Sequence, residues 1–335
     1  MSRKRAIYII AALGICLLLS VSVTSVCQAE KYVLNSISAW PQNTFMVQNF
    51  TMFMDRVNTK AAKIYPGELK IVYKGGPEVI SFREQVEAVR TGLIDMVFTA
   101  NAYYSSMIPA MDVFIATTLR PWEEREMGVY EFMEKVHAEK ANAYFLTRIG
   151  SGIPFQIYVN KPVKSLADLK GMKLRCSPPI VPFLKAIGVN PVVMKPGDIY
   201  TALERGVVDG YVWPASQIRE WGWEAVTKYA IFPVLPYMAA DVILINLDVW
   251  NKLPNHLQEF LEAEAKEAEY RTVVRALEYM PREDAELQKL GIRFIQLPDA
   301  DAKKMTDIAT ETIWAVINKK APVNGPKLQA IYNKK

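Results

Sequence analysis

Arg175 is the residue whose type and position best suit ligand chemistry. It ends the run 173–175, which reads as a short β-strand after the turn-rich segment 161–171. Ligands in α/β proteins bind beyond the carboxyl ends of the strands, and a planar guanidinium group there can donate two parallel hydrogen bonds to one carboxylate. From spacing alone, an ion pair at the surface or between two lobes remains the alternative explanation.

Aromatic residues are dense between positions 211 and 237. Most are expected to pack inside the protein, but Trp213 directly follows the expected strand 207–212 and is predicted to face a cleft. Tryptophan and tyrosine suit such places because they combine a large apolar face with a polar tip. Further candidates are Tyr211, Tyr237, Trp40 and Phe155, and Asn101 is a candidate polar contact.

Residues for catalysis or metal binding are sparse. The only histidines, His137 and His256, are far apart and both are expected to be solvated surface residues. Gly150-Ser151-Gly152 is not a nucleophile elbow, which requires G-x-S-x-G. Cys176 has no histidine placed by sequence to activate it. The sequence therefore predicts no enzyme, no cofactor and no metal site.

The N-terminus has the pattern of a secretory signal peptide. Three basic residues at 3–5 precede an apolar run at 6–23, and a small residue, Ala29, precedes Glu30. Cleavage is expected after Ala29, which predicts an exported protein. A transmembrane anchor is the alternative, because about 18 apolar residues can span a bilayer. Acylation at Cys27 is a further alternative. It is disfavoured because Val26 precedes the cysteine, where a lipoprotein would normally have glycine, alanine or serine.

The remaining chain is expected to fold without disulfides and without nucleic acid. Cys176 is the one cysteine left after cleavage, so it has no intramolecular partner. The exported chain has 37 Lys and Arg against 35 Asp and Glu, which is too nearly neutral for an electrostatic nucleic-acid surface. With 51% hydrophobic residues it can form an ample core. No later apolar run is long enough to be embedded in a membrane.

Strand and helix patterns alternate along the chain, which predicts an α/β fold. Apolar residues at spacings of three and four mark a helix over 45–64. Expected strands are 32–38, 69–73, 94–98, 156–159, 173–175, 191–194 and 207–212, and further expected helices are 82–90, 183–187 and 198–205. The pattern restarts after residue 150, so two α/β lobes with mainly parallel sheets and a cleft between them are predicted.

A charged amphipathic run after Pro254 predicts one long helix. It is expected to begin with Asn255 as its cap and to end at Pro281, which gives about 39 Å at 1.5 Å per residue. A helix of that length could lie across both lobes.

Several segments resemble one protein family. Residues 161–175 resemble the "KPV..xxDLKGxKxR" segment of the solute-binding proteins of TRAP transporters. The similarity continues through 186–191 and 200–210, and it includes 90–96 in the first half of the chain and 250–254 before the long helix. Together these segments cover most of residues 32–285, in the order of the family.

The resemblance implies a periplasmic binding protein with two α/β lobes and a long helix across both. Such a protein closes on a small organic acid and delivers it to a membrane permease driven by an ion gradient. The arginine of this motif binds the substrate carboxylate, and it corresponds to Arg175. The expected division is a signal peptide at 1–29, lobe I at 30–152 plus about 240–280, lobe II at 153–239, and a C-terminal region at about 281–335 packed on the lobes. Hinges are expected near 150–153 and 237–241.

Departures from the family pattern bear on the ligand. Trp213 stands where many dicarboxylate binders have asparagine, and Val212 where metal-binding members have glutamate. Pro154 replaces a second arginine, although Arg148 could supply that charge from elsewhere. Burying a second carboxylate without a partner would cost several kcal/mol. A monocarboxylate with an apolar, aromatic or 2-oxo/2-hydroxy body is therefore expected.

Alternatives remain open at this point. Gln156 lies near a ligating glutamine of metal-binding members and is a candidate polar contact. A dicarboxylate-binding member of the same family, a ligand-binding module for a sensor, and an exported enzyme are the alternative functions.

Overall fold

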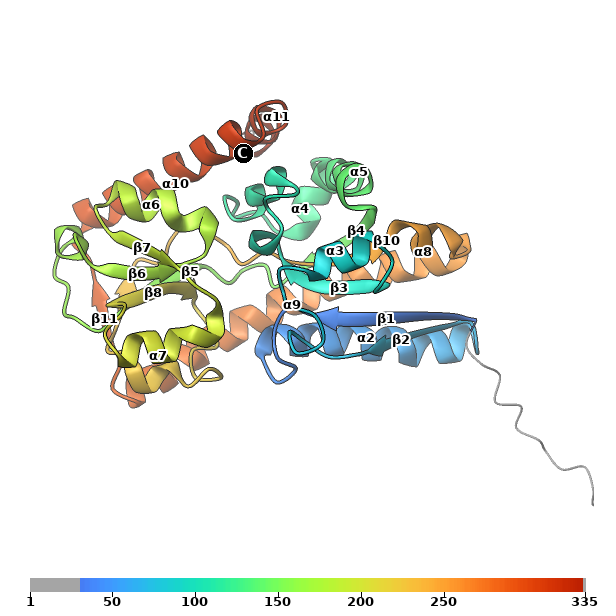
Figure 1. Cartoon of the computed structure of the whole chain (residues 1–335), viewed down its shortest axis with the longest axis horizontal. Coiled ribbons are helices and arrows are strands. Elements are labelled where there is room, and N and C mark those ends of the chain that lie inside the picture. Colours follow the sequence, from blue (N-terminus) through green and yellow to red (C-terminus); the bar gives the residue numbers. More distant parts are fainter. Residues whose placement is uncertain (1–30, 334–335) are drawn as a thin grey trace, which may run out of the picture.

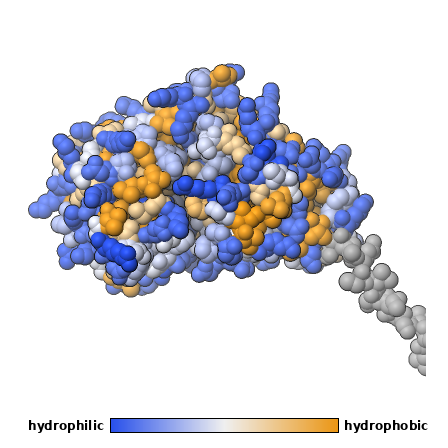
Figure 2. All heavy atoms as spheres, viewed as in Figure 1, coloured by the Kyte–Doolittle hydropathy of each residue, from blue (hydrophilic) through white to orange (hydrophobic). Residues whose placement is uncertain are grey.

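The computed structural model describes residues 31–333 and shows two lobes, each built on its own β-sheet (Figure 1). The predicted α/β fold with two lobes and a helix across them is confirmed. The predicted signal peptide at 1–29 lies outside the described residues. Figure 2 shows hydrophilic residues over most of one face of the molecule, interrupted by small hydrophobic patches.

The first sheet has five strands in the order β2-β1-β3-β10-β4. Its strands are β1 (Tyr32–Ser38), β2 (Leu69–Tyr73), β3 (Met96–Ala100), β4 (Ala143–Ile149) and β10 (Asp241–Asn246). β1 pairs in parallel with β2 and β3, whereas β10 runs antiparallel to both of its neighbours, β3 and β4. The chain therefore returns to the first lobe for β10 after it has built most of the second.

Helices of the first lobe pack on this sheet. They are α2 (Phe45–Ile64), α3 (Gln85–Arg90), α4 (Pro121–Glu126), α5 (Val129–Ala141) and α8 (Leu247–Lys252), with 3-10 turns η1 (Asn101–Tyr103) and η2 (Pro109–Phe114). α2 begins where Thr44 accepts a hydrogen bond from the backbone N–H of Val47. Its apolar stripe, including Phe50, Phe53 and Val57, is buried, which is why the spacing of three and four predicted this helix correctly.

The second sheet has six strands in the order β11-β9-β5-β8-β6-β7. Its strands are β5 (Phe155–Val159), β6 (Lys173–Cys176), β7 (Asn190–Val193), β8 (Gly210–Pro214), β9 (Tyr229–Phe232) and β11 (Arg293–Gln296). Its helices are α6 (Val181–Ala186) and α7 (Ile199–Glu204), with 3-10 turns η3 (Leu166–Leu169), η4 (Pro178–Ile180), η5 (Pro196–Asp198) and η6 (Trp223–Val226). β8 starts three residues later than expected, so Trp213 lies within the strand rather than after it. β5 is antiparallel to both β8 and β9, so neither sheet is wholly parallel.

α9 (Asn255–Lys289) crosses from the first lobe to the second (Figure 1). The predicted end at Pro281 was wrong, because the helix continues through this proline to a length of 35 residues, or about 52 Å. Beyond Pro281, Leu287 is buried in the core of the second lobe, and this packing offsets the disruption by the proline. The cap residue is Pro254 rather than Asn255, and no side chain caps the helix.

Three buried glutamates attach α9 to both lobes. Glu264 forms ion pairs with Arg56 and Lys60 of α2, and Glu269 pairs with Arg125. Glu283 pairs with Arg219 of the second lobe at 2.6 Å. The helix is therefore fixed by charge as well as by apolar packing on either side of the cleft.

Two further connections between the lobes run side by side. Residues 150–154 join β4 to β5, and residues 233–240 join β9 to β10. Backbone hydrogen bonds link them, from Phe155 to Tyr237 at 2.8 Å and from Ala239 to Ile153 at 2.9 Å. The hinges expected near 150–153 and 237–241 fall in these connections, but their motion stays a prediction.

The C-terminal helices lie on the opposite side of the lobes from α9 (Figure 1). α10 (Asp299–Lys320) contacts α6 of the second lobe and η2 of the first, and α11 (Gly325–Tyr332) also contacts η2. Lys320 reaches the buried carboxyl group of Asp112 in η2 at 3.3 Å. α10 therefore adds a further contact between the lobes.

His137 does not lie on the surface, contrary to the prediction. Its side chain is fully buried, with Nε2 3.0 Å from the Tyr104 hydroxyl and Nδ1 2.7 Å from the Met133 carbonyl. α5 is polar in composition, yet the face that carries His137 packs on β4. Burial lowers the pKa of His137 to about 4. His256 is exposed as expected, 3.0 Å from Glu68.

Candidate functional site

A two-part cavity lies between the lobes at the end of β6. The inner part, of about 50 Å³, is lined by both lobes and by the 233–240 connection. The outer part, of about 530 Å³, opens beyond it. Ala102, Tyr103, Arg175 and Ser177 line both parts, so the two are continuous.

Arg175 is buried at this junction without an acidic partner. Its side chain is only 3% exposed, and its Nε and Nη2 donate to the Met194 carbonyl at 3.1 and 2.9 Å. Within residues 31–333 no carboxylate forms an ion pair with it. Burial lowers the pKa of Arg175, because a desolvated charge without a counter-charge is disfavoured.

The sheet explains how Arg175 reaches the cavity. Arg175 pairs in register with Tyr211 on β8. Its neighbours Leu174 and Cys176 point to the opposite face of the sheet, into a different hydrophobic core from that of Tyr211 and Trp213. Trp213, two residues beyond Tyr211, lies on the same face but closer to the cleft. Its ring lies 5.2 Å from the Arg175 guanidinium, in a cation–π arrangement.

Polar groups around Arg175 are left without partners. The indole Nε1 of Trp213 and the hydroxyl of Ser177 are buried and have no hydrogen-bond partner among the described residues. Both groups can donate, as can the guanidinium. Since buried polar groups are normally hydrogen-bonded, this cluster of donors is suited to an acceptor that arrives from outside, such as a carboxylate.

The outer cavity is basic. Its lining includes Arg83 in addition to Arg175, and also Lys320, whose ammonium group lies 3.3 Å from the buried carboxyl group of Asp112. Within the described chain the lining includes no aspartate or glutamate. A concave surface with charges of one sign raises the local concentration of the opposite ion. The entrance therefore favours anions.

Five of the eight residues predicted to bind ligand line the inner cavity, namely Trp40, Asn101, Phe155, Arg175 and Trp213. Trp40 and Asn101 come from the first lobe, where Trp40 packs against Tyr103 with ring centroids 5.9 Å apart. Asn101 donates from Nδ2 to the Met111 carbonyl at 3.1 Å. That these five residues contact a ligand stays a prediction.

The other three predicted residues line neither part of the cavity. Tyr211 is buried one step deeper in the sheet than Trp213, and its hydroxyl lies 2.9 Å from Thr227. Tyr237 lies under α10 and donates to the Ala309 carbonyl at 2.7 Å. Gln156 is buried beside Trp213 and donates to the Ile231 carbonyl at 3.3 Å. Each therefore hydrogen-bonds inside the protein, although Oε1 of Gln156 has no partner among the described residues. That these three residues contact a ligand stays a prediction.

Arg148 does not supply a second charge to the cavity. It is fully buried in the first lobe and donates from Nε and Nη2 to Glu124 at 3.0 and 2.6 Å. A third bond runs to the Leu119 carbonyl. Its charge is therefore matched inside the lobe.

Cavity residues that sequence reasoning missed include Tyr103, Ser177 and Asp241. Asp241 opens β10 at the end of the hinge-side connection, where its carboxyl group is 3% exposed. Burial raises the pKa of Asp241 to about 8. Its position next to an apolar strand, 242–245, was the available signal. A charged residue at the end of a buried strand is expected to face a polar environment, such as a cleft.

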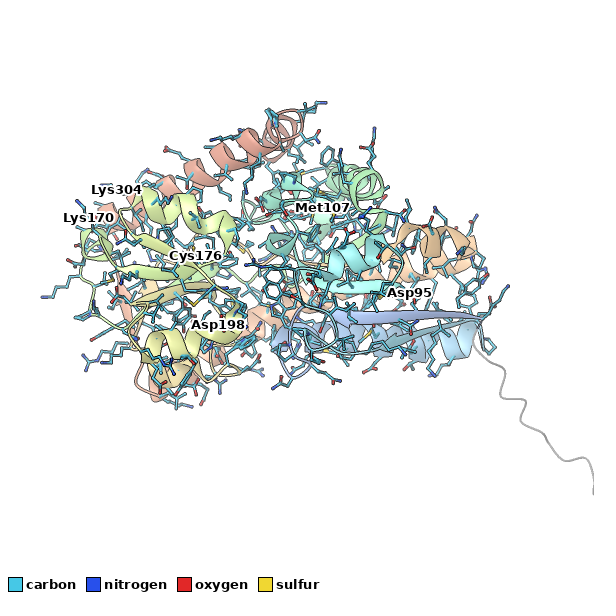
Figure 3. All side chains as sticks on the ribbon, viewed as in Figure 1. Asp95, Met107, Lys170, Cys176, Asp198 and Lys304 are labelled. Atoms are coloured by element: carbon cyan, nitrogen blue, oxygen red, sulfur yellow. The ribbon has the colours of Figure 1, made fainter. Side chains whose placement is uncertain are left out.

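Two other kinds of site find no support. Cys176 is a buried free thiol on β6 (Figure 3), and burial raises its pKa to about 12, which opposes a nucleophilic role. Residues 31–333 contain no cluster of histidine, cysteine and acidic residues that could hold a metal ion. In the same range no helix is long and apolar enough to cross a membrane.

Comparison with known proteins adds family and fold. Residues 37–320 match the family described as bacterial extracellular solute-binding protein, family 7. The chain is 26% identical over 243 residues to the monocarboxylate 2-oxoacid-binding periplasmic protein of Nostoc sp. (strain PCC 7120). That match covers 68% of this chain and 65% of the relative, so it spans just under two thirds of the relative's length.

Solved structures of TRAP periplasmic solute-binding proteins share the fold. One from Desulfovibrio salexigens with bound orotic acid has a TM-score of 0.80 and 21% identity, covering 91% of this chain and 98% of that one. Another, from Rhodoferax ferrireducens with bound malonate, has a TM-score of 0.77 and 21% identity, covering 90% and 97%. At this sequence identity the structural similarity shows the two-lobed fold alone.

Proposed function

The chain belongs to the bacterial extracellular solute-binding proteins of family 7, which serve TRAP transporters, and from this premise we propose that it captures a small organic acid between its lobes and delivers it to a membrane permease. Export with cleavage after Ala29 and closure at the two connections between the lobes are parts of the same proposal. So is the division into lobe I at 30–152 plus about 240–280, lobe II at 153–239, and a C-terminal region at about 281–335 that packs on the lobes and gives β11 to the second sheet. The family consists of solute receptors, and we propose no enzymatic activity.

One observation carries the proposal: the buried guanidinium of Arg175 faces an interlobe cavity without a carboxylate partner. A ligand carboxylate would supply the missing charge and accept hydrogen bonds from Ser177 and Trp213. Closure of the lobes would then exclude water, which strengthens a charge-assisted hydrogen bond. Trp40, Asn101 and Phe155 would form the remaining walls.

The ligand class that fits best is a monocarboxylate with an apolar, aromatic or 2-oxo/2-hydroxy body. Trp213, Phe155 and Trp40 give the inner cavity a mainly aromatic lining. Arg148, the candidate partner for a second carboxylate, already pairs with Glu124. The Nostoc relative is named for monocarboxylate 2-oxoacids, and orotic acid also has a single carboxyl group.

A dicarboxylate is the second candidate, and the outer cavity favours it. Arg83 and Lys320 line that part together with Arg175, so a longer diacid could place its second carboxylate there. The Rhodoferax structure, which shares the fold, holds malonate.

A thermal-shift screen tests the function. The panel holds aliphatic and aromatic monocarboxylates, 2-oxo and 2-hydroxy acids, dicarboxylates and a neutral amide for each acid. A ligand at 100 times its dissociation constant adds about 2.7 kcal/mol to the free energy of unfolding, which raises the melting temperature by a few degrees.

We expect shifts with monocarboxylates that disappear with the amides. In calorimetric titrations, Arg175→Ala should weaken binding of the best acid by about 2–5 kcal/mol, as expected for removal of one partner of a buried charged pair. Shifts with diacids alone would select the second candidate. Unchanged affinity of Arg175→Ala would refute the assignment of the site.

A further inference from the structure

Asp241 faces the inner cavity from the first lobe. It is the first residue of β10, paired with Ala100 and Ile149, and its side chain is 97% buried against a lining that also includes Arg175. Its Oδ2 has no hydrogen-bond partner among the described residues. A buried carboxyl oxygen without a partner is disfavoured, so a hydrogen-bond donor supplied by a ligand would stabilise it.

The surrounding backbone leaves space for this carboxyl group. Gly150 adopts a positive φ of 81°, and a Cβ at this position would lie 2.6 Å from Asp241 Oδ2. Only glycine adopts this backbone conformation readily and also avoids the carboxylate. The chain is therefore built around the acid group at the point where the first lobe meets the cavity.

In the part of the chain that the structure describes, no basic side chain forms an ion pair with Asp241. The charged or titratable groups that act on it are Arg148 from β4, which pairs with Glu124, and Tyr103 from η1. Arg175 lines the same cavity but forms no ion pair with Asp241 in the described part of the chain. Burial accordingly holds the pKa of Asp241 well above that of an ordinary aspartate.

The cavity thus has two chemically different ends. Arg175, Ser177 and the indole of Trp213 offer hydrogen-bond donors from the second lobe, whereas Asp241 offers carboxyl oxygens from the first. A ligand that fits both ends has a carboxylate at one and a hydrogen-bond donor at the other. A second carboxylate beside Asp241 would place two acid groups together, which is unfavourable.

We propose that Asp241 determines ligand specificity: the acid held by Arg175 carries a nitrogen donor, a neutral N–H or an ammonium group, that hydrogen-bonds to Asp241. This inference rests on the proposed function, because it requires the carboxylate to bind at Arg175. It narrows the ligand from organic acids in general to those with a nitrogen group opposite the carboxylate.

Proton balance separates the two kinds of donor. A neutral lactam can bind protonated Asp241, whose carbonyl oxygen accepts from the N–H and whose O–H donates to the lactam oxygen. An ammonium group favours ionised Asp241, so its binding releases a proton to the buffer to the extent that burial keeps Asp241 protonated in the unliganded protein. Titrations in two buffers of different ionisation enthalpy measure that release.

The test compares acids of one ring size. Cyclopentanecarboxylate has no donor, proline has an ammonium group, 5-oxoproline has a lactam N–H, and glutarate is the diacid control. Calorimetric titration of the purified protein should show at least one of the two nitrogen acids binding tenfold or more tightly than cyclopentanecarboxylate and glutarate.

Asp241→Asn keeps the shape of the side chain and cannot ionise. It should weaken the preferred nitrogen acid at least tenfold when that acid is proline, and abolish proton release. If the lactam is preferred, Asp241→Leu should weaken it at least tenfold, since leucine offers neither donor nor acceptor. Either variant should change binding of cyclopentanecarboxylate by less than threefold.

Asp95→Asn is the matched control. Asp95 accepts from the backbone and side chain of Asn35 at 2.7 and 2.9 Å, and it lies on the side of the first lobe away from the cleft (Figure 3). This variant should leave all four affinities unchanged. Melting curves of the variants show whether each one is folded.

Three results would overturn the role of Asp241. The first is that cyclopentanecarboxylate binds as tightly as both nitrogen acids. The second is that Asp241→Leu and the parent protein have equal affinities for every acid. The third is that none of the four acids binds. In each case the proposed function still stands if the wider panel yields an acid whose binding depends on Arg175. If no acid of the panel binds, the proposed function fails as well.

Discussion

Two arginines are equally deep in this protein, and their surroundings are opposite. Arg148 in the first lobe is 0% exposed and Arg175 in the second is 3% exposed. Each lies over an aromatic ring, Phe114 or Trp213, at 5.1 or 5.2 Å. Arg148 holds Glu124, which also accepts from the Tyr332 hydroxyl at 2.9 Å. Among residues 31–333, Arg175 hydrogen-bonds only to the carbonyl of Met194.

The difference separates a structural charge from a functional one. A buried charge is tolerated when it is paired and hydrogen-bonded. Arg148 meets this condition with residues of its own chain and therefore belongs to the core. Arg175 does not, so the carboxylate that would complete it has to come from a ligand.

The largest expected effect is on Arg148. Glu124→Gln leaves this arginine buried without its counter-charge and should lower the free energy of unfolding by about 3–5 kcal/mol. Urea unfolding with and without the best ligand measures the loss. Ligand affinity should stay within threefold, and a large loss of affinity without a loss of stability would mean that Arg148 is not a purely structural residue.

Arg175 should behave in the opposite way. Arg175→Met fills the same space without a charge, so the unliganded protein should be as stable as the parent or more stable by about 1 kcal/mol. Affinity for the acid should still fall by about 2–5 kcal/mol. If the unliganded variant instead lost stability as Glu124→Gln does, the contrast between the two arginines would collapse.

His137 extends the comparison to pH. Its folded-state pKa is lowered by burial to about 4 from an ordinary value near 6.5, so the unfolded chain binds the proton more readily. The contribution of His137 is therefore fully present above about pH 6.5 and is lost as the pH falls towards 4, by about 3 kcal/mol in all. Urea unfolding across this range measures it. His137→Gln should flatten this part of the pH profile, and an unchanged profile would contradict the buried, neutral histidine.

The smallest effect concerns the wall under Arg175. Trp213→Phe keeps an aromatic ring below the guanidinium but removes the unpartnered indole N–H, so affinity for the acid should fall by about 0.5–1.5 kcal/mol. Calorimetry resolves this difference, and stability without ligand should not change. Equal affinity would remove the indole from the donors around the carboxylate.

Much of the fold could be predicted because local pattern and burial agree. β1 and β2 have the predicted bounds, and the apolar stripe of α2 packs as its spacing requires. The errors lie where contacts distant in sequence decide. Pro281 continues a helix because Leu287 packs in the core of the second lobe. His137 is buried partly because its ring meets Tyr104, 33 residues earlier in the chain.

The candidate site was predictable to the extent that it follows strand ends. Arg175, Trp213 and Phe155 line the cavity because they lie at or near the ends of strands that meet the cleft. Tyr211 and Tyr237 are also aromatic and close in sequence, but register and α10 assign them to the interior. Asp241 was missed because an acidic residue before an apolar strand indicates only that its side chain faces a polar environment. Which environment that is depends on Arg175, which lies 66 residues earlier in the chain and lines the same cavity.

α9 has a consequence for how the protein unfolds. Its first half contributes Leu257 and Leu261 to the core of the first lobe, and its far end contributes Leu287 to that of the second. If either lobe unfolded alone, α9 would lose the core contacts and the ion pair that it makes with that lobe, Glu269 in the first or Glu283 in the second. The same helix is part of the core of the other lobe. The two lobes should therefore denature as one cooperative unit, in spite of having separate sheets.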